Sequence, residues 1–236
     1  MSRGLGDVYK RQTLTLPGTP DGKQNFQVAR SKGFEGMAIS PDGSKLYPLL
    51  EGALWDGELF ENVGGKRYLR MLEFDVKQQV WTGRSWQYVL EDNQNAIGDF
   101  NMIDDTHGLV IERDNGEGTM DKACVVGAVT NNCFSQVAKF KRVYKIAFSD
   151  TNVGKPVEKL SYIDLMNIQD PNKLARKPLS DGVLTFPFVT IENVDVVDAN
   201  HIIVGNDNNF PFSSSRWPNM ADDNEFILLD VKNFLK

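Results

Sequence analysis

The sequence predicts an all-β fold, and two observations support that expectation. Short runs of apolar and β-branched residues alternate with turns rich in Gly, Pro, Asn and Asp, and apolar residues at helical spacing are nearly absent. A chain of 236 residues with 41% hydrophobic content is long enough to bury a substantial core. We expect one or two helical turns around 164–169. The expected strands, in chain order, include Met37–Ser40, Lys45–Leu50, Tyr68–Val76, Trp86–Leu90, Gly108–Glu112, Val143–Phe148, Ile202–Val204 and Phe226–Val231.

Charge and hydropathy exclude two classes of partner. The formal net charge is −6 and no basic run occurs, so we expect no nucleic-acid partner, because such proteins concentrate Lys and Arg on one face. No apolar run reaches the roughly 18 residues of a membrane-spanning helix. We therefore expect no membrane span, and a small molecule as the binding partner.

Three stretches of the chain share an internal register, which predicts repeated hairpins. They are FEGMAISPDGSKLYPLLE (34–51), GDFNMIDDTHGLVIERD (98–114) and IENVDVVDANHIIVGND (191–207). Each begins with an acid, crosses a short strand, turns at PDGSK, DDTH or DANH, and follows a second strand to another acid. Antiparallel hairpins place the start of the first strand beside the end of the second. The leading acids are Glu35, Asp99 and Glu192, and the closing acids are Glu51, Asp114 and Asp207.

Further strands follow each hairpin, and the resulting units of about four strands have the content of a β-propeller blade. We expect about three to four blades of a larger propeller. The first strand of each blade lines the channel of a propeller, so the carboxylates should converge on one mouth of it. The leading acids are separated by 64 and then 93 residues, so insertions must lie between the hairpins.

Hard oxygen donors with scarcely any His or Cys beside them favour Ca²⁺ over zinc. Crowded like charges also repel one another unless a cation compensates them. The two histidines, His107 and His201, lie at the turns, opposite the acids, so this stretch offers no histidine base for Ser-His-Asp chemistry. The expected metal ligands are Glu35, Asp99, Glu192, Asn206 and Asp207.

The expected catalytic residues are Glu112, Asp114 and Arg216. Glu112 alternates in phase with Asp114, and either could act as a ligand or a base. Arg113 points the other way and is expected to be a packed or surface cation. Arg216 follows the third hairpin and should reach the mouth, where its planar fork could bind a substrate phosphate.

Cys124 and Cys133 are nine residues apart, within ACVVGAVTNNCF. Cysteines at this spacing can close a small loop, and a disulfide would suit an exported protein. Free buried thiols are the alternative, and we expect the disulfide.

Several segments together resemble the phytase-like family, which is described by an esterase-like activity of phytase. The segments are GFEGMAISPDGSKLY, GLVIERDNGEG, FKRVYKI, TFPFVTIENVDVVDANHIIVGNDNNFPFSSSR and DDNEFILLDV. The resemblance implies a β-propeller, a Ca²⁺ requirement, a periplasmic or secreted location, and hydrolysis of phosphoesters or related esters. Gluconolactonase and paraoxonase propellers carry a metal-binding Glu in a similar position, which implies that Glu35 is a channel ligand.

Residues 1–12 (MSRGLGDVYKRQ) have no apolar signal-peptide core and resemble a translated sequencing adapter. We expect them to be non-native, and residues 13–236 to be the C-terminal part of a propeller whose N-terminal blades and signal peptide are missing.

The leading functional hypothesis is a Ca²⁺-dependent hydrolase of phosphoesters. Two alternatives stay open at this point. One is a non-catalytic, Ca²⁺-stabilised propeller that acts as a binding module, and the other is a lactonase or carboxylesterase on the same fold.

Overall fold

The computed structural model describes residues 27–29, 31–55, 58–176 and 181–236. The segment 1–12, expected to be non-native, lies outside these residues. Within them the fold is all-β, as predicted, and the helical elements are two short 3-10 turns, η1 (Met120–Lys122) and η2 (Asp150–Asn152).

Three antiparallel sheets make up the body of the described chain. Sheet 1 has the order β1-β2-β4-β5, and β3 pairs with the start of β4. Sheet 2 has the order β6-β7-β8-β9, and sheet 3 has the order β12-β13-β14. The strands of sheet 1 are β1 (Phe34–Ile39), β2 (Lys45–Leu50), β3 (Asn62–Val63), β4 (Lys66–Asp75) and β5 (Val80–Val89). Those of sheets 2 and 3 are β6 (Ala96–Met102), β7 (His107–Arg113), β8 (Lys141–Ala147), β9 (Glu158–Asp164), β12 (Ile191–Asp198), β13 (His201–Asn206) and β14 (Phe226–Asp230).

The helical turns expected around 164–169 are wrong. The Asp164 carboxylate accepts a hydrogen bond from the backbone of Met166 at 2.9 Å, which closes a tight turn. The chain then enters β10 (Ile168–Gln169), which pairs with β11 (Val183–Leu184) in a separate hairpin. The local side-chain bond and the strand pairing therefore replace helical hydrogen bonds.

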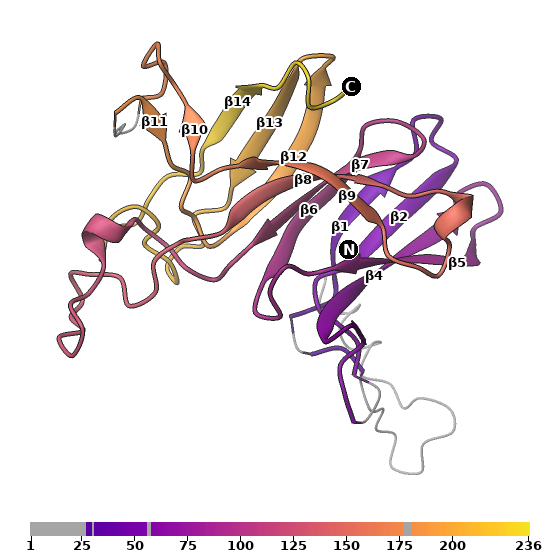
Figure 1. Ribbon diagram of the computed structural model, residues 1–236, viewed down its shortest axis with the longest axis horizontal. Coiled ribbons are helices and arrows are strands. Elements are labelled where there is room, and N and C mark those ends of the chain that lie inside the picture. The colour runs from indigo at the N-terminus through magenta and orange to yellow at the C-terminus, as the bar shows by residue number, and fades with distance from the viewer. Residues whose placement is uncertain (1–26, 30, 56–57, 177–180) are drawn as a thin grey trace, which may run out of the picture.

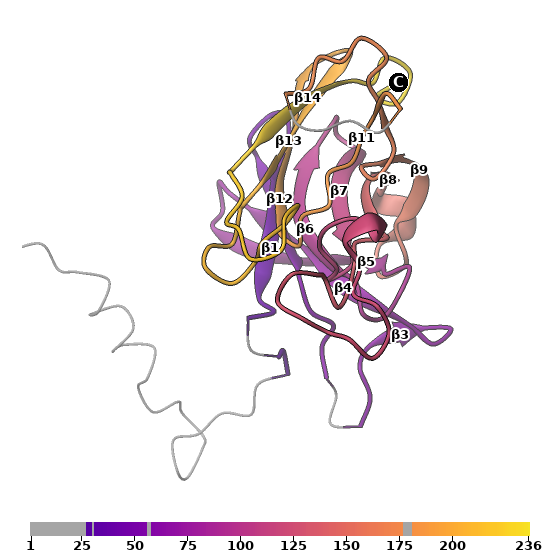
Figure 2. The same ribbon diagram turned by 90° about the vertical axis from the view of Figure 1, so that its left-hand side faces the viewer.

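The three sheets lie side by side in chain order, with sheet 2 in the middle (Figure 1). Strand β6 contacts both β1 and β12, so the first strands of the three sheets are neighbours, and β12 is seen next to β6 again after a 90° turn (Figure 2). Glycines make this approach possible. A Cβ atom on Gly36 would stand 2.6 Å from the backbone nitrogen of Phe100, and one on Gly98 would stand 1.8 Å from the carbonyl oxygen of Ile191.

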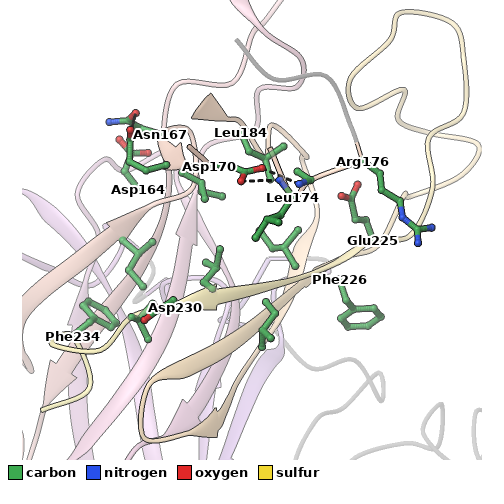
Figure 3. Close-up of a pocket in the computed structure, with 18 of the residues that line it drawn as sticks. Asp164, Asn167, Asp170, Leu174, Arg176, Leu184, Glu225, Phe226, Asp230 and Phe234 are labelled. Carbon is green, nitrogen blue, oxygen red and sulfur yellow. Dashed lines mark hydrogen bonds between the residues drawn. The ribbon is translucent and has the colours of Figure 1, made fainter. Parts of the chain in front are cut away.

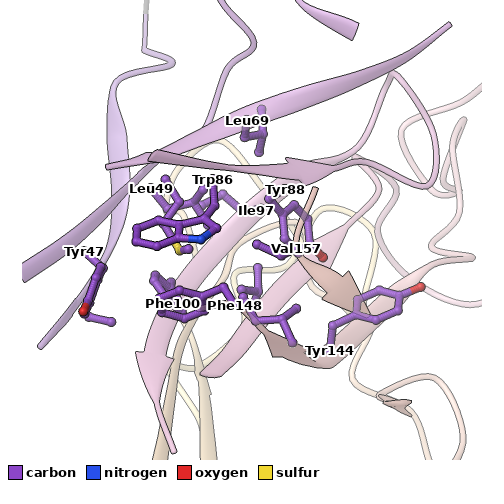
Figure 4. Close-up of a cluster of buried hydrophobic side chains, with 14 of the residues drawn as sticks. Tyr47, Leu49, Leu69, Trp86, Tyr88, Ile97, Phe100, Tyr144, Phe148 and Val157 are labelled. Carbon is purple, nitrogen blue, oxygen red and sulfur yellow. The ribbon is translucent and has the colours of Figure 1, made fainter. Parts of the chain in front are cut away.

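Two hydrophobic clusters fill the spaces on either side of sheet 2. The first joins sheets 1 and 2 through edge-to-face aromatic contacts, such as Trp86 with Phe148 at 5.1 Å between ring centroids (Figure 4). The second joins sheets 2 and 3. Strand β7 serves both, because Val110 belongs to the first cluster and Leu109 and Ile111 to the second. Sheet 2 is therefore covered on both faces, which explains why β7 reads as a nearly continuous apolar run.

Candidate active site

The first two strands of each sheet share a register shift at the same place in the hairpin. Residue pairing skips one residue between Phe34 and Gly36, and again between Ile191 and Asn193. In sheet 2 the shift falls between Ile97 and Phe100. A bulge leaves the extra residue unpaired and re-aims its side chain. Glu35 and Glu192 are these extra residues, so both acids are turned out of the regular pleat.

This register corrects the sequence alignment of the middle repeat. The last pairs before the bulges are Phe34 with Leu50, Ile97 with Glu112, and Ile191 with Asn206. Leu50, Glu112 and Asn206 are the members of these pairs on the second strands. The next residues along those strands, Glu51, Arg113 and Asp207, therefore occupy equivalent positions in the three sheets. Sheet 2 therefore supplies an arginine where sheets 1 and 3 supply carboxylates. An alignment of the three repeats on the apolar residues before the bulges, instead of on the acids, would have revealed that Arg113 is equivalent to Glu51 and Asp207.

We call the group formed by Glu35, Glu51, Glu192, Asp207, Arg113 and Lys32 the acid mouth. Glu51 is buried and accepts a hydrogen bond from Lys32 at 2.8 Å. An Arg113 nitrogen, Nη2, lies 3.6 Å from the same Glu51 oxygen. Arg113 is packed and points the opposite way from Glu112, as expected, but the expectation that this direction leads away from the acids is wrong. Arg113 and Lys32 were missed as site residues because their charges match no acidic pattern.

The carboxylates of the acid mouth influence one another electrostatically. Reduced hydration raises the pKa of Glu192, and the negative charges of Glu35 and Asp207 raise it further. Reduced hydration and the charge of Glu51 likewise raise the pKa of Glu35. Arg113 opposes both shifts. Glu35 and Glu192 come from different sheets, and their strands, β1 and β12, both contact β6.

A metal site is not preformed in the part of the chain that the structure describes. No three His, Cys, Asp or Glu side chains there are placed so that they could hold an ion. Three of the five expected ligands, Glu35, Glu192 and Asp207, nevertheless lie in the acid mouth. Their oxygen atoms are the donor type that Ca²⁺ prefers.

The other two expected ligands are engaged in structural hydrogen bonds. The Asp99 carboxylate accepts from the backbone nitrogens of Phe100 at 2.8 Å and Val194 at 2.9 Å, which ties β6 to β12. The Asn206 amide is buried, and it bonds the backbone of Asp223 and Glu225 at 3.1 and 2.8 Å. These contacts position sheets and loops.

Glu112 lies between sheets 1 and 2, on the opposite face of β7 from Arg113. It is 0% exposed, and its carboxylate accepts from Tyr88 at 2.9 Å, Asn95 at 2.9 Å and Lys159 at 2.7 Å. The backbone nitrogen of Glu91 donates to it as well, at 2.7 Å. The expectation that Glu112 shares a side with the acids is therefore wrong, because strand alternation turns it into the interface between the sheets.

Asp114 and Arg216 also form ion pairs outside the acid mouth. Asp114 lies 2.7 Å from the buried ammonium of Lys141 and accepts from the backbone of Lys139 and Phe140. Arg216 is buried in ion pairs with Asp222 and Glu225, each at 2.7 Å. The charge of Asp114 is thus compensated by the first residue of β8, and that of Arg216 within the loop that follows β13.

The remaining sequence expectations concern the histidines and cysteines. His107 and His201 lie at the hairpin turns as expected, where each contacts the aspartate three residues earlier at 2.9 Å. Cys124 and Cys133 form the expected disulfide. It closes the tip of the insertion between β7 and β8.

A groove of about 1150 Å³ lies elsewhere, along β14 and the β10–β11 hairpin (Figure 3). Asp170 is one of its acids, and both of its oxygens accept backbone hydrogen bonds, from Leu174 and Ala175. The Asp164 carboxylate closes the turn described above. The groove is lined by no residue of the acid mouth. Two further acids of the groove are paired, Glu225 with Arg216 and Asp230 with Lys232. Because these four acids are already engaged, we place the candidate chemistry at the acid mouth.

Comparisons with known proteins agree with the resemblance found in the sequence. No curated protein matches the chain. None of the helices in the described part of the chain is long and apolar enough to cross a membrane. A family model described as "Phytase-like: Esterase-like activity of phytase" matches residues 2–210. The chain therefore belongs to the phytase-like family.

Proposed function

We propose that the chain is an esterase-like hydrolase that cleaves phosphoesters or related esters at the acid mouth. One observation carries the proposal beyond family membership. Bulges at equivalent positions turn Glu35 and Glu192 out of sheets 1 and 3, and the negative charge of Glu35 raises the pKa of Glu192. Maintaining such repulsion is costly for a fold unless a ligand compensates it.

We further propose that Ca²⁺ is that ligand, held by Glu35, Glu192 and Asp207. The donor chemistry fits, because all three provide carboxylate oxygens on flexible side chains and Asp207 and Glu35 are exposed. The side chains must draw together to hold the ion, since they form no ready cage. A bound Ca²⁺ would polarise a phosphoryl or carbonyl oxygen of the substrate.

The chain's own residues have separate tasks in this proposal. Glu51 holds Lys32 and lies beside Arg113, so it keeps two positive charges at the mouth. The hydrogen bond that Asp99 accepts from Val194 holds the first strands of sheets 2 and 3 in fixed register. Glu192 therefore stands on a strand that is tied to sheet 2, as a binding site requires.

The side-by-side arrangement of β1, β6 and β12 supports a β-propeller in which these strands line the channel. The disulfide between Cys124 and Cys133 supports export to the periplasm or beyond, because disulfides persist in oxidising compartments. We propose both as properties of the protein.

Hydrolysis of p-nitrophenyl phosphate and p-nitrophenyl acetate, with Ca²⁺ and with a chelator, tests the function. We expect turnover that chelation abolishes and that Glu35→Gln and Glu192→Gln each reduce. Asp195→Asn is the matched control, because it removes a charge from an exposed position of β12 outside the acid mouth. Chelator-resistant turnover would overturn the metal mechanism.

The substrate panel also separates the alternatives. The family description names an esterase-like activity, which favours a carboxylesterase or lactonase as the second candidate. Turnover of acetate esters or lactones without turnover of phosphate esters would support it. Stabilisation by Ca²⁺ with no turnover of any ester would indicate a binding module.

A further inference from the structure

Arg113 occupies an unusual position for a buried cation. It ends β7, only 6% of its surface is exposed, and sheets 1 and 3 supply carboxylates at the equivalent positions. A purely acidic mouth would repel a negatively charged substrate. The middle sheet therefore adds positive charge where the repeat would otherwise continue its acids.

The guanidinium of Arg113 is held in place on one side. Its Nη1 donates to the Asn115 side chain at 2.7 Å, and Asn115 in turn donates to the backbone of Gln94 at 3.0 Å. This chain of bonds fixes the plane of the guanidinium without using its other edge.

The other edge, formed by Nε and Nη2, is not saturated. Among the described residues, Nε has no hydrogen-bond partner although it is buried. Nη2 faces Glu51 at 3.6 Å, which is longer than a hydrogen bond. Glu51 is held more closely by Lys32, at 2.8 Å, so it can turn toward Lys32 and leave Nη2 to another acceptor. A buried unpaired donor is costly, and two parallel N–H groups match two oxygens of a phosphate or carboxylate.

We propose that the Nε–Nη2 edge of Arg113 binds a negatively charged oxygen pair of the substrate and makes the acid mouth selective for anionic esters. This inference rests on the proposed hydrolase function and adds the residue that sets its substrate class. The carboxylates of sheets 1 and 3 hold the cation, and the arginine of sheet 2 holds the anion. Arg113 is thus a specificity residue and not merely a counter-ion of Glu51.

Titration of inorganic phosphate into the full chain at saturating Ca²⁺, followed by calorimetry, tests the proposal directly. We expect Arg113→Lys to weaken phosphate binding by on the order of tenfold, because it keeps the charge and loses the fork. Arg113→Met should weaken it further. Arg142→Met is the control, since Arg142 lies on the same sheet over the rings of Phe140 and Tyr162. Equal phosphate affinity in wild type and Arg113→Lys, or no phosphate binding by wild type, would overturn the proposal.

A kinetic ratio separates recognition from a structural role. We expect the ratio of kcat/KM for p-nitrophenyl phosphate to kcat/KM for p-nitrophenyl acetate to fall in Arg113→Lys, because the phosphate ester loses more than the acetate ester when the fork is removed. Equal loss on both esters would show that Arg113 only supports the fold. Phosphate binding that depends on Arg113 in a protein without turnover would refute the hydrolase function and leave this inference standing.

Discussion

Gly98 of sheet 2 packs against the backbone of Ile191 in sheet 3, so we expect Gly98→Ala to destabilise the fold. An added Cβ would stand 1.8 Å from the Ile191 carbonyl oxygen and 2.9 Å from its carbon. The obstruction is backbone, so no side chain can rotate away. An ordinary carbon–oxygen contact is about 3.3 Å, so β6 and β12 must separate by about 1.5 Å.

The expected loss follows from the cost of overpacking. Extra methyl groups in a well-packed core typically cost about 1–3 kcal/mol. For a domain of this size, each kcal/mol lowers Tm by about 2–4 °C, so we expect a decrease of about 2–12 °C. Separation of the two strands would also move Glu192 away from Glu35 and weaken Ca²⁺ binding.

Thermal unfolding followed by circular dichroism measures this loss, and Gly33→Ala is the matched control. Gly33 has open space around the position of an added Cβ, and neither glycine has a positive φ. Both substitutions reduce the entropy of the unfolded chain equally. The difference between their Tm values therefore reports only the contact of the added Cβ with Ile191. Equal Tm values for the two variants would refute the close packing of β6 on β12.

Three further predictions concern charge, burial and the disulfide. Burial and repulsion raise the pKa of Glu192, so the stability it contributes is full below its unfolded pKa and is lost as pH rises through the folded pKa. Without Ca²⁺, Glu192→Gln should therefore be more stable than wild type at pH 7, and urea titrations should show that this advantage disappears near pH 4; an advantage that persists there would contradict the assignment. Glu112→Ala removes one of the two carboxylates beside Lys159 and leaves Tyr88 and Asn95 without their acceptor, so it should cost about 3–5 kcal/mol in urea unfolding while the folded protein keeps its kcat; loss of kcat in folded protein would instead support a catalytic Glu112. Serine substitution of Cys124 and Cys133 should speed proteolysis within their loop and leave the Tm of the sheets unchanged, and a large fall in Tm would show that the disulfide supports the core.

Strand positions could be predicted from the sequence because the signals are local. The predicted Lys45–Leu50 is the observed β2, and the turns between hairpin strands lie where PDGSK, DDTH and DANH predicted them. Apolar alternation and turn residues act within a few positions of one another, so they can be recognised without knowledge of the tertiary fold.

The composition of the site was only partly predictable, because it depends on bulges and long-range contacts. All three hairpins carry a bulge, but the middle one has Gly98 where the others have Glu35 and Glu192, so its first acid, Asp99, lies one residue later in the repeat. The acid pattern therefore led to Asp99 and Asp114, whereas the structure places Arg113 at the mouth. Glu112 illustrates the second difficulty, since its ion-pair partner Lys159 lies 47 residues away.

Calcium titration calorimetry on wild type, Glu192→Gln and Asp195→Asn tests the central claim most directly, which is that carboxylates of sheets 1 and 3 form one cation site. We expect one ion to bind per chain in wild type and in Asp195→Asn. Loss of a charged ligand in Glu192→Gln should weaken binding by on the order of tenfold or more. Equal affinity in all three proteins, or no binding by wild type, would contradict the assignment of the acid mouth as a calcium site.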